Sequence, residues 1–290
     1  MPVKLWDSAR IFMPDTVTTM GRSIVQHGLL NNRVYLMTPH PGDVPWIVEK
    51  LFKLASTKGY SKILARIPVS MEGIFKEAQY VREAAVPGYL ISGEDLLFVS
   101  RFLREARGRE NHPDRVARNF TLIEKYSRPH PVCRHDLPAI RPCNQNDCME
   151  IARIFRQVFA SYPFPVDDSD YLAHTMASHT RYFCVTENDR IVGLCAGEMD
   201  MDNLAVEMTD FAVVPEMRGQ GLAGRLLAEM ERDMRSRGMR IAFTIARTLS
   251  PGINLIFKQM NYHWGGTLVN NTHISGGIES MWVWYKRLVE

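Results

Sequence analysis

The apolar positions of the 290-residue chain fall into short continuous runs and into segments with helical spacing, and the two kinds alternate. In the first half, runs at residues 33–37 and 60–67 predict strands, and each is followed by a segment with one apolar face. Alternation of this kind is typical of a mixed α/β (α+β) fold. Helices are expected at residues 43–58 and 70–78, and two closing strands at residues 81–91 and 95–102.

The second half shows the same alternation over a longer stretch. Its pattern predicts the order strand, helix, helix, three strands, helix, strand, helix and two strands. The first thirty residues show no clear pattern, and residues 104–137 are polar and proline-rich, which is typical of a linker. We therefore expect an N-terminal segment (1–30), an α/β domain (31–103), a linker (104–137) that is partly helical, and a second α/β domain (138–290).

Composition limits the class of protein. The net charge of +3 is too small to indicate nucleic-acid binding, and 46% apolar with 23% charged residues is ordinary for a soluble globular protein. No apolar stretch is long enough to cross a membrane. The five cysteines are irregularly spaced, which favours a reducing cytoplasm. His130, Cys133 and His135 lie close together but lack a fourth ligand, so no metal site is expected.

One run, residues 210–227, combines a buried strand, a proline-marked exit, a glycine-rich turn and an amphipathic helix. Glycine lets the backbone approach a ligand closely, and the first N–H groups of a helix have no partner within the helix. Those groups and the positive end of the helix dipole point at one place. The run therefore predicts an anion-binding turn, although a tight strand-to-helix turn without a ligand has the same glycines.

The segment Arg218-x-x-Gly221-x-Ala223 resembles the pyrophosphate loop of the Gcn5-related N-acetyltransferases (GNAT). The order of elements expected from residue 138 onward is also that of this superfamily. The resemblance implies acetyl-CoA as co-substrate, with pantetheine beside the strand and the pyrophosphate on the turn. The residues implied to bind acetyl-CoA are Phe211, Ala212, Val213, Arg218, Gly219, Gln220, Gly221, Leu222, Ala223, Gly224 and Asn254.

Acetyl transfer to an amine requires a base. A lysine-type amine has a pKa of about 10.4, so only about one molecule in 2,500 is neutral at pH 7. A carboxylate can take the surplus proton. The resemblance favours Glu207, which alternates onto the same strand face as Thr209 and Phe211, whereas Asp210 is expected on the opposite face and is the second candidate. A strand-edge carboxylate in water is the alternative reading of Glu207.

The acid that protonates the leaving thiolate is not assigned. Many members of the superfamily place a tyrosine in the late helix, but that register holds Phe257 in this chain. Tyr262 and Tyr285 are the remaining candidates. A thiol with a pKa of about 8.5 also leaves fairly well as the thiolate, so a dedicated acid is not essential.

Several phrases spread along the chain resemble one subfamily, the beta-lysine N6-acetyltransferases of bacteria and archaea. They include Tyr162-Pro163-Phe164-Pro165, Glu207-Met208-Thr209-Asp210 and Glu279-Ser280-Met281. The resemblance implies acetylation of the terminal amine of beta-lysine, which yields an osmolyte. The acceptor pocket is expected beneath the first phrase and a long polar loop at residues 270–281. Expected acceptor contacts are Tyr162, Phe164, Asn271 and Glu279. Glu279, Asp167, Asp168 or Asp170 is expected to bind the ammonium, and Arg181 or Arg247 the carboxylate.

Two other functions stay open. One is acetyl transfer to a polyamine, another diamino acid or a peptide amine, and the other is a CoA-binding module without transfer. No nucleic-acid or membrane partner is expected, and a homodimer remains open. Residues 74–80 also resemble residues 256–262, which favours a degenerate, non-CoA-binding GNAT-like copy at residues 31–103, unless the similarity is due to chance.

Overall fold

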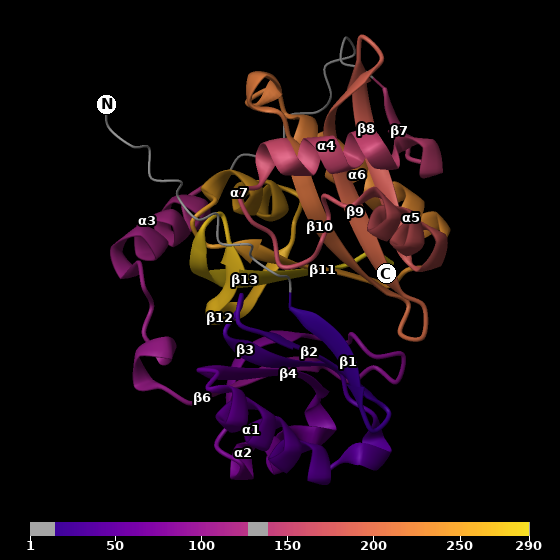
Figure 1. Cartoon of the computed structure of the whole chain (residues 1–290). Helices are drawn as coiled ribbons and strands as arrows, with labels where there is room; N and C mark the ends of the chain where they lie inside the picture. The colour runs from indigo at the N-terminus through magenta and orange to yellow at the C-terminus, as the bar shows by residue number, and fades with distance from the viewer. Residues whose placement is uncertain (1–14, 127–138, 290) are drawn as a thin grey trace, which may run out of the picture.

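Figure 1 shows a computed structural model of the chain, which describes residues 15–126 and 139–289. All strands of the described residues join one 13-stranded mixed sheet in the order β1-β2-β3-β4-β6-β5-β12-β13-β11-β10-β9-β8-β7. The expected mixed α/β class is confirmed. The N-terminal half contains β1 (Thr16–Met20), β2 (Ser23–Gly28), β3 (Arg33–Thr38), α1 (Trp46–Lys58), β4 (Lys62–Pro68), α2 (Glu72–Glu77), β5 (Val81–Val86) and β6 (Leu96–Phe102).

The second half has the order of elements that its sequence pattern predicts. It begins with a short edge strand and ends with a long hairpin that lies at the centre of the whole sheet. Its elements are β7 (Ile140–Pro142), α4 (Cys148–Val158), α5 (Ser169–Ser178), β8 (Thr180–Glu187), β9 (Arg190–Asp200), β10 (Ala205–Val213), α6 (Leu222–Ser236), β11 (Ile241–Arg247), α7 (Pro251–Gln259), β12 (His263–Ile274) and β13 (Gly277–Arg287).

The two halves share a strand order. Read from the two ends of the sheet toward its centre, β2-β3-β4-β6-β5 corresponds to β9-β10-β11-β13-β12. In each half one parallel pair, β3 with β4 or β10 with β11, is connected through a helix, α1 or α6. The N-terminal half therefore repeats the path of the C-terminal part of the second half.

The halves meet where β5 pairs with β12 at Ala84 and Gly266. A Cβ atom at Gly266 would lie 2.3 Å from the main-chain oxygen of Glu83, so only glycine permits this approach. Lys62 donates to Glu83 at 2.8 Å and to the main-chain oxygen of Val269 at 2.8 Å, which adds buried polar contacts beside the junction. The sheet is therefore continuous between the halves.

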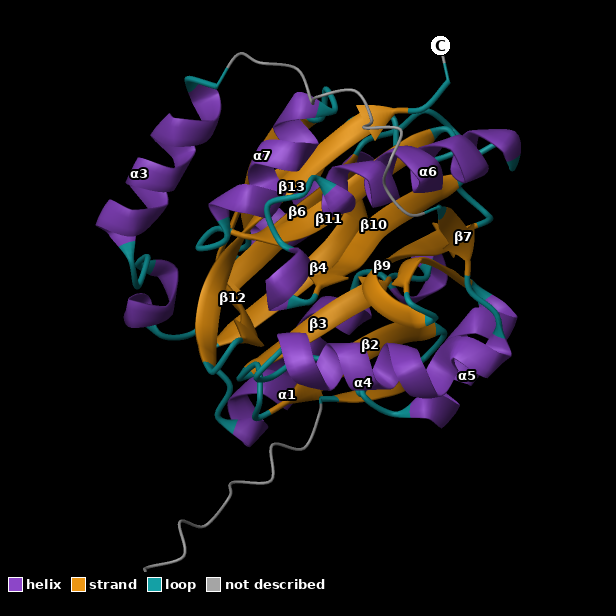
Figure 2. Ribbon diagram, turned by 90° about the horizontal axis from the view of Figure 1, so that it is seen from above, coloured by secondary structure: helices purple, strands orange, loops and turns teal. Residues whose placement is uncertain are grey.

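The sheet curls at this junction. Arg66 of β4 lies 5.5 Å from the ring of Phe243 on β11, although four strands separate β4 from β11 in the sheet. The face of the N-terminal half that carries Tyr35 and Leu64 packs against Phe243 and Met281 of the second half. Figure 2 shows strands of both halves, among them β3 and β10, between the helices α4 and α6. Curling encloses the space in which the candidate site lies.

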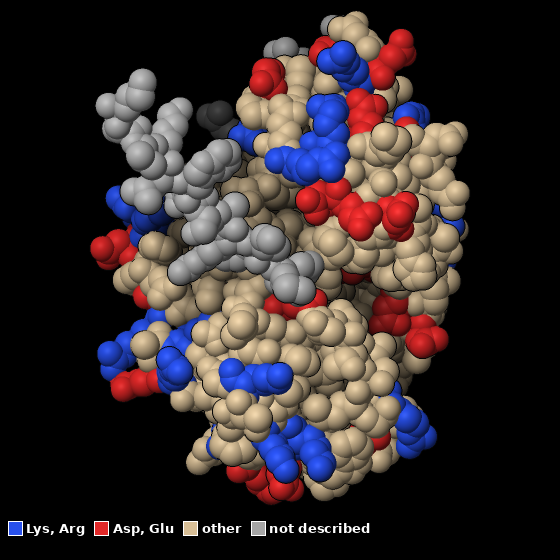
Figure 3. Space-filling model, in the orientation of Figure 1, with Lys and Arg blue, Asp and Glu red and all other residues tan. Residues whose placement is uncertain are grey.

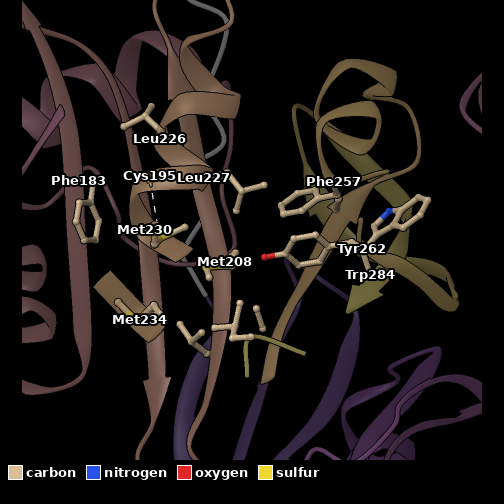
Figure 4. Packing of buried hydrophobic residues seen from close by; sticks show 14 of the residues in the cluster. Phe183, Cys195, Met208, Leu226, Leu227, Met230, Met234, Phe257, Tyr262 and Trp284 are labelled. Atoms are coloured by element: carbon tan, nitrogen blue, oxygen red, sulfur yellow. Dashed lines mark hydrogen bonds between the residues drawn. The ribbon is translucent and has the colours of Figure 1, made fainter. Parts of the chain in front are cut away.

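Helices cover both faces of the second half. Cys184 and Leu194 pack under α4, whereas their neighbours Phe183 and Cys195 pack under α6, as strand alternation requires. Figure 4 shows the α6 side, where Met230 and Leu227 face Met208, and Phe257 and Tyr262 close the cluster. This core fixes the position of β10, the strand that leads to the glycine-rich turn.

Two expectations about elements need correction, and a third agrees with the structure. Residues 16–20 and 23–28, which show no clear apolar pattern, form β1 and β2; β1 pairs with β2, and β2 pairs with β3. The expected linker is partly helical as predicted, because it contains α3 (Pro113–Glu124), which packs on α7 and places Phe120 against Trp264 and Trp282. The expected loop at residues 270–281 consists of strand residues around a two-residue turn, with the side chains of Asn270 and Asn271 buried.

Candidate functional site

The parallel strands β10 and β11 separate in the middle of the sheet. They pair only at residues 205–207 with residues 241–243, and no pairing follows. A cavity of about 870 Å³ lies beside the separated segments, which contribute Phe211, Val213, Thr244 and Ala246 to its wall. Main-chain groups between the two strands are thus available to an elongated ligand.

Asp210 lies in the same cavity as Glu207, Thr209 and Phe211, which corrects its expected position on the opposite face. The reason is a β-bulge between Thr209 and Ala212, where Asp210 has a left-handed φ of 57°. A bulge interrupts the strict alternation of side chains along a strand. Both candidate bases therefore reach one site.

A third carboxylate, Glu198 of β9, pairs directly opposite Glu207 and also lines the cavity. Burial and Glu198 raise the pKa of Glu207 to about 8, although Arg66 opposes the shift. Burial and Glu198 likewise raise the pKa of Asp210 to about 7, against hydrogen bonds from Tyr162 and Thr209. Each group can exchange a proton near neutral pH, so the alternative of a solvated strand-edge carboxylate does not describe Glu207.

Arg66 of β4 brings the positive charge that partly compensates these carboxylates. It lines the cavity, and its Nη2 donates to the Tyr89 hydroxyl at 2.8 Å. Tyr89 in turn donates to Asp200 at 2.9 Å, which ties the N-terminal half to the end of β9. The N-terminal half therefore builds part of this site.

Tyr162 and Phe164 also line the cavity, as expected for the aromatic segment after α4. The Tyr162 hydroxyl donates to Asp210 in a short hydrogen bond, and its ring lies 4.8 Å from that of Phe159. Burial and Asp210 raise the pKa of Tyr162 well above its ordinary value, so its proton stays on the hydroxyl. Tyr162 is thus positioned beside a candidate base.

The glycine-rich turn borders the other end of the site. Gly219 and Gly221 have φ angles of 78° and 79°, and within the described chain no main-chain N–H from residue 219 to residue 224 has a hydrogen-bond partner. The described residues thus leave these donors to a ligand or to water. The turn residues that line the cavity are Arg218, Gly219, Gly221, Leu222 and Ala223, whereas Gln220 and Gly224 are not part of its wall, nor is Ala212 of β10.

Asn254 is fully buried, which excludes the reading of a surface residue. Its Nδ2 donates to the main-chain oxygens of Arg247 and Ser250, both at 2.8 Å, and its Oδ1 accepts from Trp284 at 2.9 Å. Because both amide hydrogens are used within the protein, Asn254 holds α7 against β11 and β13.

Phe257 lines the cavity at the register where many GNAT enzymes have a tyrosine, and its ring packs edge-on against Phe211 at 5.6 Å. The two substitute tyrosines, Tyr262 and Tyr285, are not part of the cavity wall. Among the described tyrosines, Tyr35, Tyr126 and Tyr162 are.

Glu279 does not line the cavity, because it forms a two-pronged ion pair with Arg247 at 3.0 and 2.7 Å. Arg181 pairs with Asp233 on α6, outside the cavity wall. Asp168 caps α5, and it lines a separate cavity together with Asp167. Of the residues expected to hold the acceptor, the cavity gathers Tyr162, Phe164, Asn271 and Arg247.

Three charged residues of the cavity were not found from the sequence: Glu198, Arg33 and Arg66. Glu198 could have been identified from its position in β9, the strand that pairs with β10. The two arginines reach the cavity only because the sheet curls, which the sequence pattern does not show. Figure 3 shows that acidic and basic side chains are intermingled on the face of the molecule that it draws.

No group of metal-ligating side chains is found within the residues that the structure describes, and no described helix is long and apolar enough to cross a membrane. His130, Cys133 and His135 lie outside the described residues.

The model of the acetyltransferase (GNAT) family matches residues 148–256. The chain is 33% identical to the beta-lysine N(6)-acetyltransferase of Methanococcus maripaludis over 94% of this chain and 98% of that protein. It is 29% identical to the protein of the same name in Methanosarcina mazei over 83% of this chain and 97% of that protein. It is 28% identical to the N-acetyltransferase YodP of Bacillus subtilis over 92% of this chain and 96% of that protein.

Proposed function

Because the chain belongs to the GNAT acetyltransferase family, we propose that it transfers the acetyl group of acetyl-CoA to the terminal amine of beta-lysine. The acceptor rests on the names of two relatives that align with nearly their whole lengths, and the N-terminal half is included in that alignment. The observation that carries the proposal is the cavity, which is lined both by an anion-binding turn with unpaired N–H groups and by a set of carboxylates with raised pKa values.

The turn fits the diphosphate of acetyl-CoA. Its unpaired N–H groups lie at the start of α6, where the helix dipole favours an anion, and Arg218 adds a positive side chain. The separated segments of β10 and β11 fit the pantetheine arm, because its amide groups can pair with exposed strand backbone. Phe211, Ala212 and Val213 would lie along that arm.

Glu207 is the proposed base. It takes a proton from the terminal ammonium of the acceptor, and the neutral nitrogen attacks the thioester carbonyl carbon. A C–N bond forms, and the C–S bond breaks, so that CoA leaves as the thiolate. The nitrogen loses its second proton in this step. The thiolate of CoA then takes up a proton and becomes the thiol. A base with a pKa near 8 is matched to this task at neutral pH, since it is partly ionised and still basic.

Asp210 and Tyr162 form the second part of the proposed proton path. The Tyr162 hydroxyl donates to Asp210, which shares the cavity with Glu207. A proton released at the nitrogen can move to Asp210, and Tyr162, which lines the same cavity, carries a hydroxyl that can donate to the thiolate. Tyr162 would thus take the role for which Phe257 has no hydroxyl.

The N-terminal half is proposed to be a copy of the C-terminal part of the second half that has lost the CoA site. The shared strand order supports the copy. The turn after β3 contains Pro39 and Pro41, which lack N–H donors, and the buried carboxylate of Asp43 accepts from Ser23 at 2.7 Å. A turn with two prolines and a buried carboxylate is unsuited to binding a diphosphate, which supports the loss of the CoA site.

N6-acetylation would leave beta-lysine with one ammonium and one carboxylate. Such a zwitterion has no net charge, which suits the proposed role of an osmolyte in the cytoplasm.

The test is a thiol-release assay with acetyl-CoA and an amine panel of beta-lysine, lysine, ornithine and spermidine. We expect the highest kcat/KM with beta-lysine. A higher kcat/KM with lysine, ornithine or spermidine would show that the protein is an acetyltransferase with another acceptor. Acetyl-CoA binding without turnover of any amine would favour a CoA-binding module instead.

A further inference from the structure

Arg33, the first residue of β3, places a guanidinium in the wall of the cavity although only 4% of the residue is exposed. Its Nη1 donates to the main-chain oxygen of Asn271 at 2.7 Å and to Thr272 Oγ1 at 3.5 Å. Its Nη2 contacts Gln26 Oε1 at 3.5 Å, and its Nε has no partner within the described residues. Within the described residues, neutral oxygens therefore supply every hydrogen bond that this cation makes, and the carboxylates of Asp15 and Glu83 act on it only through space.

The other arginines of the cavity wall are either close to a carboxylate or, like Arg218, exposed to solvent. Arg247 is paired with Glu279 through Nε and Nη2, and Arg66 lies in the field of Glu207. Arg218 borders the turn that is proposed to hold the diphosphate. A buried cation is ordinarily paired with an anion, because neutral oxygens replace its lost hydration only in part. Among the described residues, no carboxylate contacts Arg33 directly, which leaves room for an anionic ligand beside this buried cation.

Arg33 lies apart from Arg66, the arginine whose charge acts on the proposed base Glu207. Arg33, Tyr35 and Met37 alternate along β3 and all line the cavity. Arg33 pairs with Lys62 of β4, so Arg66 is four residues farther along, a distance of roughly 13 Å between main-chain positions. Tyr35 lies between them, with the Arg33 guanidinium 5.0 Å from its ring.

Asn271 supplies an acceptor beside this cation. Its side chain is buried, lines the cavity and has an Oδ1 atom without a partner within the described residues. The same residue accepts from Arg33 through its main-chain oxygen. An unpaired donor and an unpaired acceptor therefore belong to two residues in direct contact, on one wall of one cavity.

We propose that Arg33 binds the carboxylate of the acceptor and that Asn271 accepts a hydrogen bond from the ammonium next to it, so that the far amine extends toward Glu207. The proposal rests on the proposed acetyl transfer to beta-lysine, whose carboxylate and internal ammonium are close together. Arg33 is then a specificity-determining residue, supplied by the half that lacks a CoA site.

This arrangement makes the enzyme selective for amino acids over polyamines. A polyamine would place a second cation or an apolar carbon against Arg33, leaving the guanidinium without an anion. The test compares two acceptors that differ in the carboxylate alone: beta-lysine and 1,4-diaminopentane, which is beta-lysine without that group. A charge-assisted hydrogen bond to a carboxylate gives a preference of roughly 10- to 150-fold in kcat/KM.

In the wild-type protein we expect beta-lysine to be preferred by that factor. In Arg33→Gln the ratio of the two kcat/KM values falls to about one, chiefly through a higher KM for beta-lysine, while turnover of 1,4-diaminopentane persists. Arg107→Gln is the matched control, because Arg107 is also buried, donates to Ser61 and to the main chain of Asn31, and is not part of the cavity wall. Its ratio should stay that of the wild type.

An unchanged ratio in Arg33→Gln, or an equal loss with both acceptors, would overturn the role of Arg33 while leaving acetyl transfer intact. Absence of wild-type turnover with beta-lysine would overturn the proposed function as well. A third acceptor, the amide of beta-lysine, needs no variant: the wild-type protein should use it as poorly as 1,4-diaminopentane. Equal use of the amide and the acid would contradict the proposal even if Arg33→Gln did not fold.

Discussion

Glu207 of β10 lies directly opposite Glu198 of β9 in the antiparallel pair, so two carboxylates share one face of the sheet. Like charges in this position destabilise each other. In a partly enclosed cavity the pair therefore holds a proton at pH values where isolated carboxylates are ionised. This relationship gives the proposed site a base that is available near neutral pH.

Glu207→Gln should lower kcat by about 100- to 1,000-fold, the usual contribution of a general base. The wild-type activity should rise with pH through the range near 7 to 8, because the ionised form of the carboxylate set accepts the proton. The variant should lose this rise and keep only the dependence that comes from the amine. Binding of acetyl-CoA, followed by calorimetry, should not change. An unaltered pH profile would exclude Glu207 as the base.

Arg66→Met should move the pH profile upward by about one unit. The guanidinium stabilises the ionised form of Glu207 and so lowers its pKa, while Glu198 and Asp210 raise it. Removing the positive charge raises the pKa further, and less of the base is ionised at pH 7. Arg101→Met is a suitable comparison, since Arg101 packs over Phe52 outside the cavity. A profile that stays in place, or moves to lower pH, would contradict the account.

Tyr162→Phe should reduce kcat several-fold and raise the pKa of Asp210, because the lost hydrogen bond favours the ionised carboxylate. The pH profile of kcat resolves this change. Tyr182→Phe removes a buried hydroxyl that contacts Thr175 at 3.2 Å, outside the cavity wall, and should leave kcat near the wild-type value. Equal effects of the two substitutions would show that Tyr162 has only a packing role.

Gly221→Ala should raise the KM for acetyl-CoA by about 5- to 30-fold. A side chain at a left-handed φ costs about 1–2 kcal/mol, and relief of that strain would turn the N–H groups away from the diphosphate. Gly238 has the same φ of 79° and the same open space around its Cβ position, but it follows the far end of α6. Gly238→Ala should destabilise the fold without changing this KM. An equal rise in the KM for acetyl-CoA in both variants would show that the turn has no specific role in binding acetyl-CoA.

Most of the order of helices and strands in both halves could be predicted from the sequence, because apolar residues recur with the period of a helix or of a strand in each segment. Residues 16–20 could not be assigned, because β1 is an edge strand with mostly exposed side chains. The polar residues 270–274 were also misassigned. They are buried strand residues whose hydrogen bonds come from partners far along the chain, such as the bond from the main chain of His273 to Asn31 at 2.7 Å.

The candidate site could be predicted where it depends on one local segment. Gly219 and Gly221 predict a turn before a helix, and in the structure this turn lines the cavity. Asp210 was assigned to the wrong face because a left-handed residue in a strand leaves no clear trace in the sequence. Arg33 and Arg66 reach the cavity only through the curl of the sheet, which no local pattern encodes.

Glu279 illustrates a different limit. Its position near the end of the hairpin was predicted correctly, but its partner was not. Arg247 takes both carboxylate oxygens, so a residue that was expected to contact the acceptor supports the cavity wall instead. The presence of a charged residue near a site is thus not enough to assign it a role in ligand binding, because a residue of opposite charge can pair with it in the folded protein.

The most direct test of the central claim is the position of the acetyl group in the product, determined by NMR after reaction of beta-lysine with ¹³C-labelled acetyl-CoA. The account predicts the label on the terminal nitrogen, because Glu207 lies by the thioester while Arg33 and Asn271 hold the other end of the acceptor. Acetylation of the internal nitrogen, or no labelled product, would contradict it.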